Sequence, residues 1–102
     1  MSDKAIYINE KQSQIIKWLA ELAKLDIEAK ELGEEKWAPF EEHLKEFNDQ
    51  LKEVERLLSE INNSPHDDIE PIILETEKKW NNVKVSYEDS VLEFNRISKN
   101  TG

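Results

Sequence analysis

The side chains with most potential for metal binding or proton transfer are two histidines and the carboxylates near them. A metal site needs several converging ligands, and neither residue four positions away from His43 is a ligand type. His66 begins an oxygen-rich cluster that is completed by Asp67, Asp68 and Glu70. Calcium requires about six oxygens on a loop with a glycine at its sharp turn, and this cluster has no glycine. We therefore interpret it as the solvated start of a helix and predict no metal and no cofactor.

Adjacent carboxylates, Glu34 with Glu35 and Glu41 with Glu42, suggest general acid–base catalysis as a second chemistry. That chemistry needs a carboxyl group buried in a concave site so that its pKa rises, whereas carboxylates on an exposed helix face stay ionised. The chain also lacks cysteine, a glycine-rich phosphate loop and a Ser/His/Asp set arranged to converge. We therefore predict no catalytic residues and no enzyme activity.

The elements that carry these side chains are expected to be helices. Only two glycines and three prolines are available for turns in 102 residues, and charged residues make up 36% of the chain. The net charge of −9 repels phosphate backbones and anionic lipid headgroups, which makes nucleic acid and membrane surfaces poor partners. Because the chain has neither an apolar run of 18 residues nor the apolar segment of a signal peptide, we expect a cytoplasmic protein.

The middle of the chain carries the clearest periodicity, with apolar residues at alternating steps of three and four. The members of this stripe are Trp37, Phe40, Leu44, Phe47, Leu51, Val54, Leu58 and Ile61. The pattern predicts a helix over about 37–62, with charged residues between the members of the stripe forming its wet face.

The first and last parts of the chain repeat this pattern and predict helices over about 3–32 and 70–99. The first stripe contains Ile8, Ile15, Trp18, Leu22, Leu25, Ala29 and Leu32, widened by Leu19. Lys11 is its one polar member. The last stripe contains Ile69, Ile73, Thr76, Trp80, Val83, Tyr87, Val91, Phe94 and Ile97. Strict stepping there reaches Ser90, but we expect Val91 beside it to face inward.

Two breaks separate the helices and set the topology. Gly33 suits the position just after a helix, and Pro39 is tolerated in the first turn of the next one. Ser64 is a plausible cap for the segment that follows, with Pro65 at its first helical position, but Pro71 predicts a short irregular turn over 65–69 before the regular third helix. Short connections predict a single domain over 1–102, an all-α, left-handed, antiparallel three-helix bundle. The rival topology, one long rod formed by fusing the first two helices, is opposed by Gly33 and Pro39.

Four large residues are the expected core anchors of this bundle: Trp18, Trp80, Phe47 and Leu51. Trp37 lies at the tip of the bundle, where it either caps the core or contacts an adjoining domain. Exposed apolar residues suggest a lateral interface instead of an enzyme site. On a helical wheel Leu74, Val85 and Leu92 fall within about 20° of one another, and Ile16, Ala23 and Ile27 form a flank on the first helix. The alternative is that these side chains are scattered surface residues of an ordinary kind.

The chain resembles a spectrin repeat, and among these the rod repeats of α-actinin. Ile15-Ile16-Lys17-Trp18-Leu19-Ala20-Glu21 is similar to the Trp-Leu signature of the family's first helix, and Glu77-Lys78-Lys79-Trp80-Asn81-Asn82-Val83 to its third-helix tryptophan. Asn63-Ser64-Pro65 is similar to the opening of some third helices. Pro71 and the Trp37–Phe40 segment depart from the family pattern. The resemblance implies a rod module of a cytoskeletal actin cross-linking protein, without catalysis or cofactor.

This resemblance also implies antiparallel self-association of neighbouring rods and binding of actin only through other domains of a longer parent. We therefore expect a structural spacer associated with the cytoskeleton, with a homodimer formed through lateral helix faces. The alternative from another class is a helical adaptor that binds a partner helix in an apolar groove.

Overall fold

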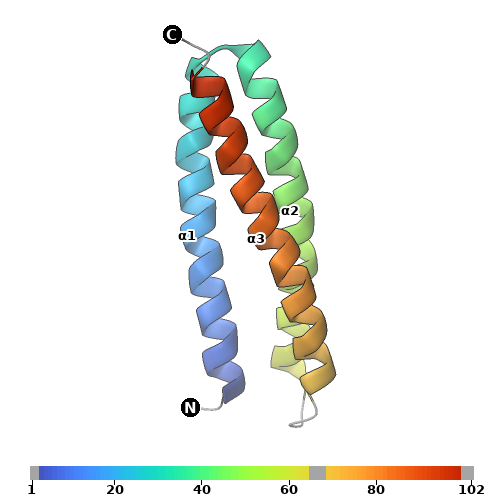
Figure 1. Cartoon of the computed structure of the whole chain (residues 1–102). Helices are drawn as coiled ribbons and strands as arrows, with labels where there is room; N and C mark the ends of the chain where they lie inside the picture. The colour runs from blue at the N-terminus through green and yellow to red at the C-terminus, as the bar shows by residue number, and fades with distance from the viewer. Residues whose placement is uncertain (1–2, 65–68, 100–102) are drawn as a thin grey trace.

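The computed structural model describes residues 3–64 and 69–99, and nearly all of them are helical. α1 spans Asp3–Glu31, α2 spans Glu34–Asn63 and α3 spans Glu70–Lys99. The helices run up, down and up, so that each is antiparallel to the next along the chain (Figure 1). All three pack against one another in a rod with extents of 55 × 21 × 16 Å. The prediction of an all-α three-helix bundle is therefore confirmed, and the two-helix rod formed by fusing the first two segments is wrong.

The core follows the three predicted stripes, with differences at Leu19, Leu57, Ser86 and Ser90. The buried apolar residues of the core cluster are Ile8, Ile15, Leu22, Leu25, Ala29, Phe40, Phe47, Leu51, Val54, Leu58, Ile61, Val83 and Ile97. Leu57, which lies outside the strict alternation of three and four, is also fully buried. Ser90 is fully buried, whereas Val91 beside it is half-buried, so strict stepping identified the inward position better than side-chain polarity did.

Small polar side chains occupy part of the inner face of α3. Thr76, Ser86 and Ser90 are all buried, and two of them satisfy their hydroxyls within α3. The Thr76 hydroxyl donates to the Ile72 carbonyl at 2.7 Å, and the Ser90 hydroxyl donates to the Ser86 carbonyl at 2.9 Å. The cost of burying these groups is thereby reduced, and the backbones of α2 and α3 come closer over more of their length than either comes to α1.

The first junction places α2 three residues earlier than the predicted start near residue 37. Gly33 has a φ of 107°, which an L side chain rarely adopts, and its carbonyl accepts from the Trp37 amide at 2.9 Å. Because α2 begins at Glu34, Pro39 lies in its second turn and not in its first as predicted. The proline has no N–H to donate to the carbonyl of Glu35, so one helical hydrogen bond is missing there.

At the second junction, α2 ends at Asn63 and α3 begins at Glu70. The Ser64 amide donates to the Ile61 carbonyl at 3.3 Å, and Lys4 of α1 donates to the Ser64 carbonyl at 2.7 Å. Pro71 is the second residue of α3, where the first-turn amide is not needed for a helical bond. The irregular turn predicted over 65–69 lies outside the described residues except for Ile69.

Candidate interaction surfaces

The described residues contain no group of three or more His, Cys, Asp or Glu side chains that could hold a metal ion. His43 is half-buried on α2, and Glu70 is exposed at the start of α3. The remaining members of the His66 cluster lie outside the described residues. Of the neighbouring carboxylates, Glu41 forms an ion pair with Lys45 at 3.6 Å.

A ladder of aromatic rings joins α1 to α3. The rings of Trp18 and Trp80 stack with centroids 4.9 Å apart, and Trp18 also stacks on Tyr87 at 5.3 Å. These three side chains are half-buried and pack against the core, whereas Phe47 and Leu51 are buried within it. Rings also meet between α2 and α3, where Phe40 contacts Phe94 edge-on with centroids 5.9 Å apart.

Lys11 occupies the one polar position of the α1 stripe and extends this ladder. Its Nζ lies 4.3 Å from the centroid of the Trp80 ring and 3.1 Å from Oε2 of Glu77, so the ammonium has both a π face and a carboxylate as partners. Its side chain is only 17% exposed. Lys11 therefore bridges α1 to α3 through its charge, while its aliphatic part fills a core position.

Tyr7 also contacts Lys11, and the centroid of its ring lies 5.4 Å from the Lys11 Nζ. Its hydroxyl oxygen is buried and makes no hydrogen bond within 3.5 Å to a described residue. Burial, followed by the negative charge of Glu77, raises the pKa of Tyr7 to about 12. The folded chain therefore disfavours the ionised phenolate more strongly than water does.

Trp37 is held at the opposite end of the rod by side chains of α1. Its indole N–H donates to Asp26 Oδ1 at 2.6 Å, and Lys30 lies 5.3 Å above its ring. Lys30 also pairs with Asp26 at 3.3 Å. Trp37 packs against the core cluster. It therefore pins the junction between α1 and α2, as one of its two predicted roles requires.

The residues predicted to form lateral interfaces are all exposed on the outside of the bundle. Leu74, Val85 and Leu92 lie on α3, and Ile16 and Ile27 lie on α1. Two of them, Ile16 at 67% and Leu92 at 65%, are matched in exposure while lying on different helices. Leu19, which was expected to widen the core stripe, is 40% exposed. Its side chain faces a groove that the sequence pattern did not predict.

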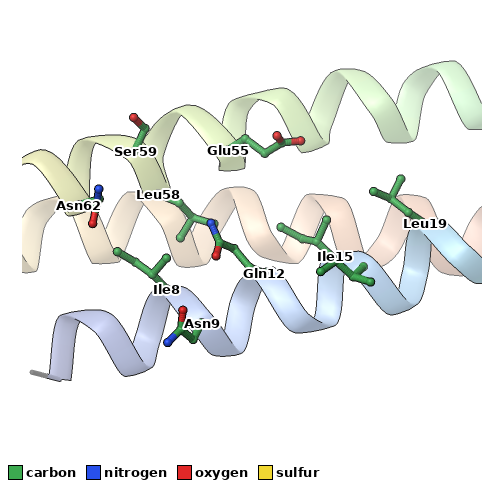
Figure 2. Close-up of a pocket in the computed structure, with 10 residues that line it drawn as sticks. Ile8, Asn9, Gln12, Ile15, Leu19, Glu55, Leu58, Ser59 and Asn62 are labelled. Carbon is green, nitrogen blue, oxygen red and sulfur yellow. The ribbon is translucent and has the colours of Figure 1, made fainter. Parts of the chain in front are cut away.

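This groove lies between α1 and α2 and has a volume of about 580 Å³. Figure 2 shows Leu58 of α2 and Gln12 of α1 pointing toward each other across it, with Ile15 and Leu19 further along α1. Its lining comprises Ile8, Asn9, Gln12, Ile15, Ile16 and Leu19 from α1, with Glu55, Leu58, Ser59 and Asn62 from α2. Glu55 is the only charged residue among them. The lining thus combines aliphatic side chains with amide, hydroxyl and carboxylate groups.

A second hollow of about 170 Å³ continues along the same side of the bundle. It shares Leu19 with the first and is lined further by Leu22, Ala23, Asp26, Leu44, Phe47 and Asn48. No single sequence stripe contains this wall, because it combines the flank of one helix with the flank of another. A helical wheel could identify each flank but could not show that the two flanks meet.

None of the described helices has both the length and the apolar character needed to span a membrane. Comparison with protein-family models, with curated proteins and with solved structures gave no match. The resemblance to spectrin repeats therefore stays a prediction that rests on the residues around Trp18 and Trp80, the Asn63-Ser64-Pro65 segment and the length of the chain.

Proposed function

We propose that this chain is an in-line spacer, a structural module that holds the segments before and after it at a fixed separation. One observation carries the proposal. Three antiparallel helices place the start of α1 and the end of α3 at opposite ends of a rod 55 Å long (Figure 1). An even number of such helices would return both chain ends to the same end.

The packing of the rod supports this role. Core residues extend from Ile8, near the start of α1, to Ile97, near the end of α3, so both ends of the rod are tied into one core. Each junction is fixed by contacts with α1, through Trp37 at one end and Lys4 at the other. A spacer of this kind needs neither a catalytic site nor a ligand.

The test is a distance measurement between the two ends. Because the chain has no cysteine, Asp3→Cys combined with Lys99→Cys places spin labels at those two positions only. We expect one narrow distance peak. A flexible chain of about 100 residues has a similar average separation, roughly 55 Å, but a broad distribution. A broad distribution for this chain, under conditions in which circular dichroism shows it folded, would refute fixed spacing.

The cytoskeletal setting of this spacer is a proposal supported by the resemblance to α-actinin rod repeats. In that setting the parent is a cytoplasmic actin cross-linking protein, and its actin-binding domain is separate from this module. We expect the chain, added to actin filaments and centrifuged, to remain in the supernatant. Sedimentation with the filaments would show that this module itself carries actin binding.

A second candidate function is the docking of a partner helix, and the groove between α1 and α2 favours it. Grooves that accept amphipathic helices offer apolar side chains to the partner, and this one is lined by aliphatic residues of both α1 and α2. In this function Ile16 and Leu19 line the site from α1, while Leu58 lines it from α2.

This docking function is tested with the hydrophobic dye 1-anilinonaphthalene-8-sulfonate. We expect the folded chain to enhance its fluorescence, Ile16→Glu to abolish the enhancement, and Leu92→Glu to preserve it. The two substitutions add the same charge at nearly equal exposure, but only Ile16 lines the groove. Equal loss in both variants, or no enhancement by the unmodified chain, would count against docking in this groove.

A further inference from the structure

The exposed flank of α1 that borders the groove carries no charge over about 27 Å of helix. Its members, which lie within an arc of about 120° on a helical wheel, are Asn9, Gln12, Ser13, Ile16, Leu19, Ala20, Ala23 and Ile27. All of them are exposed, although charged residues make up 36% of the chain. We call this surface the neutral flank. A partner that contacts it meets aliphatic, amide and hydroxyl groups and no ion.

The opposite side of the groove, on α2, carries one charge at Glu55. Figure 2 shows Glu55 on the α2 side, with Gln12 and Leu19 on the α1 side. Glu55 is exposed and forms no ion pair with any described residue. The cations Lys52 and Arg56 on α2 line neither this groove nor the adjoining hollow. The groove thus has one anionic side and one uncharged side.

The dimensions of the groove match a helix. The first hollow begins at Ile8 and the second reaches Asp26, and the two share Leu19. This stretch of α1 is about 27 Å long, the length of a partner helix of about 18 residues. Packed helices have axes about 8–10 Å apart, so a fourth helix resting on α1 and α2 contacts both sides at once. An extended peptide would find no sheet edge to pair with, because the described residues form helices.

We infer that the groove binds one amphipathic helix of another protein, which carries cations on its α2 side and no charge on its α1 side. The inference rests on the docking function proposed above and specifies the partner for it. The aliphatic seam of the partner helix covers Ile16, Leu19 and Leu58. A lysine or arginine on one flank of that seam meets Glu55, and small or amide side chains on the other flank lie against the neutral flank of α1.

Desolvation makes this charge pattern selective. Docking removes water from Glu55, and a cation in the partner offsets that cost, whereas an anion there would add repulsion. A charged side chain over the neutral flank would lose water without gaining a counter-ion. A helix that is charged on both flanks of its seam, as in an ordinary coiled coil, is therefore rejected in either direction. A helix with cations on one flank fits in the single direction that puts them on α2.

Fluorescence anisotropy with designed peptides tests the inference. The probes are synthetic helices of about 18 residues with blocked ends, a leucine seam, and alanine and glutamine elsewhere. The first carries lysines along one flank of the seam, the second carries glutamates there, and the third carries the same lysines opposite the seam. We expect the first to bind on the order of 10-fold more tightly than either of the others. Because the first and third have the same composition, attraction to the net charge of −9 does not account for that difference.

A charge reversal on the chain tests the role of Glu55. Glu55→Lys should make the glutamate-flank peptide the tighter binder. Glu46→Lys is the matched control and should leave the order unchanged, because Glu46 is also exposed on α2 but lies outside the groove. Ile16→Glu should weaken binding of the first peptide on the order of 10-fold, and Leu92→Glu should not. Equal affinity for the first and third peptides, or an order that Glu55→Lys leaves unchanged, would overturn the inference.

The dye experiment separates failure of this inference from failure of docking itself. If Ile16→Glu abolishes the dye fluorescence but the peptides show no flank preference, docking in the groove stands and the inferred partner is wrong. If the unmodified chain neither enhances the dye nor binds a peptide, both fail. Sedimentation equilibrium of the chain alone examines a second copy as the occupant. Self-association that Ile16→Glu abolishes and Leu92→Glu preserves would place a second copy in the groove and would overturn the inference.

Discussion

Removing the Trp80 ring is expected to cost about 3–4.5 kcal/mol of unfolding free energy. Truncating a fully buried aromatic residue to alanine costs about 3–5 kcal/mol. Trp80 is half-buried, so its share of that cost is roughly 2 kcal/mol. Loss of the stack on Trp18, at 4.9 Å, adds about 0.5–1.5 kcal/mol, and loss of the contact with Lys11 adds about 0.5–1 kcal/mol.

The assay is urea unfolding of Trp80→Ala followed by far-ultraviolet circular dichroism. Leu92→Ala is the matched surface control, with an expected change within about 0.5 kcal/mol because that side chain lies in solvent. Near-ultraviolet circular dichroism gives an independent readout. The coupling signal of two stacked indoles should vanish in Trp18→Phe and in Trp80→Phe, and it should persist in Trp37→Phe.

A loss below about 1 kcal/mol in Trp80→Ala would refute the assignment of the aromatic ladder as the main tie between α1 and α3. A near-ultraviolet signal that survives Trp80→Phe would contradict the stacked geometry itself. The two results are independent, because the first reports energy and the second reports the arrangement of the rings.

Three further predictions follow from the polar and irregular positions. The pKa of Tyr7 is raised to about 12 in the folded state, above its unfolded value of 10.0. The stability that depends on a neutral Tyr7 phenol is therefore fully present below pH 10 and is lost as the pH rises toward 12. Urea melts at pH 9 and 11.5 should show a smaller loss for Tyr7→Phe than for the unmodified chain, and an equal loss would contradict this account. Ser86→Ala removes a buried hydroxyl that has no hydrogen-bond partner among the described residues, so the free energy of unfolding measured in urea should stay equal or rise by up to about 1 kcal/mol; a loss above that amount would reveal a partner of this hydroxyl. Pro39→Ala restores an amide that can donate to the carbonyl of Glu35 and should raise the thermal midpoint by an amount corresponding to about 1 kcal/mol or more, whereas a lower midpoint would show that proline's restriction of the unfolded chain dominates.

The helices and most of the core could be predicted from sequence because apolar spacing directly reports which side faces inward. The strict stepping even identified Ser90, although its polarity argued for Val91. A buried serine is tolerated there because its hydroxyl bonds to the carbonyl of Ser86 one turn earlier, and a pattern of apolar residues does not register that bond. Leu57 was missed for a different reason, because strict stepping admits only one of the adjacent residues Leu57 and Leu58, and both are buried.

The start of α2 and the groove could not be derived in the same way. Pro39 argued for a start near residue 37, but the packing of Phe40 and the hold of Asp26 on Trp37 stabilise an earlier turn despite the missing hydrogen bond. Leu19 falls between the core and the solvent on a helical wheel. Its place at the groove depends on the distance between α1 and α2, which is set by the packing of the helices and cannot be read from the residues of either helix alone.

The up-down-up path determines how the rod responds to tension applied to its two chain ends. Such a load runs lengthwise along the helices and shears α1 past α2 and α3, and α1 is the helix with the fewest close backbone approaches. Once its 29 residues unravel, they span up to about 100 Å. The remaining pair is then pulled from the start of α2 and the end of α3, which lie at the same end of the rod (Figure 1). The load then no longer slides α2 and α3 past each other but pulls them apart from one end. These two helices therefore separate one turn at a time.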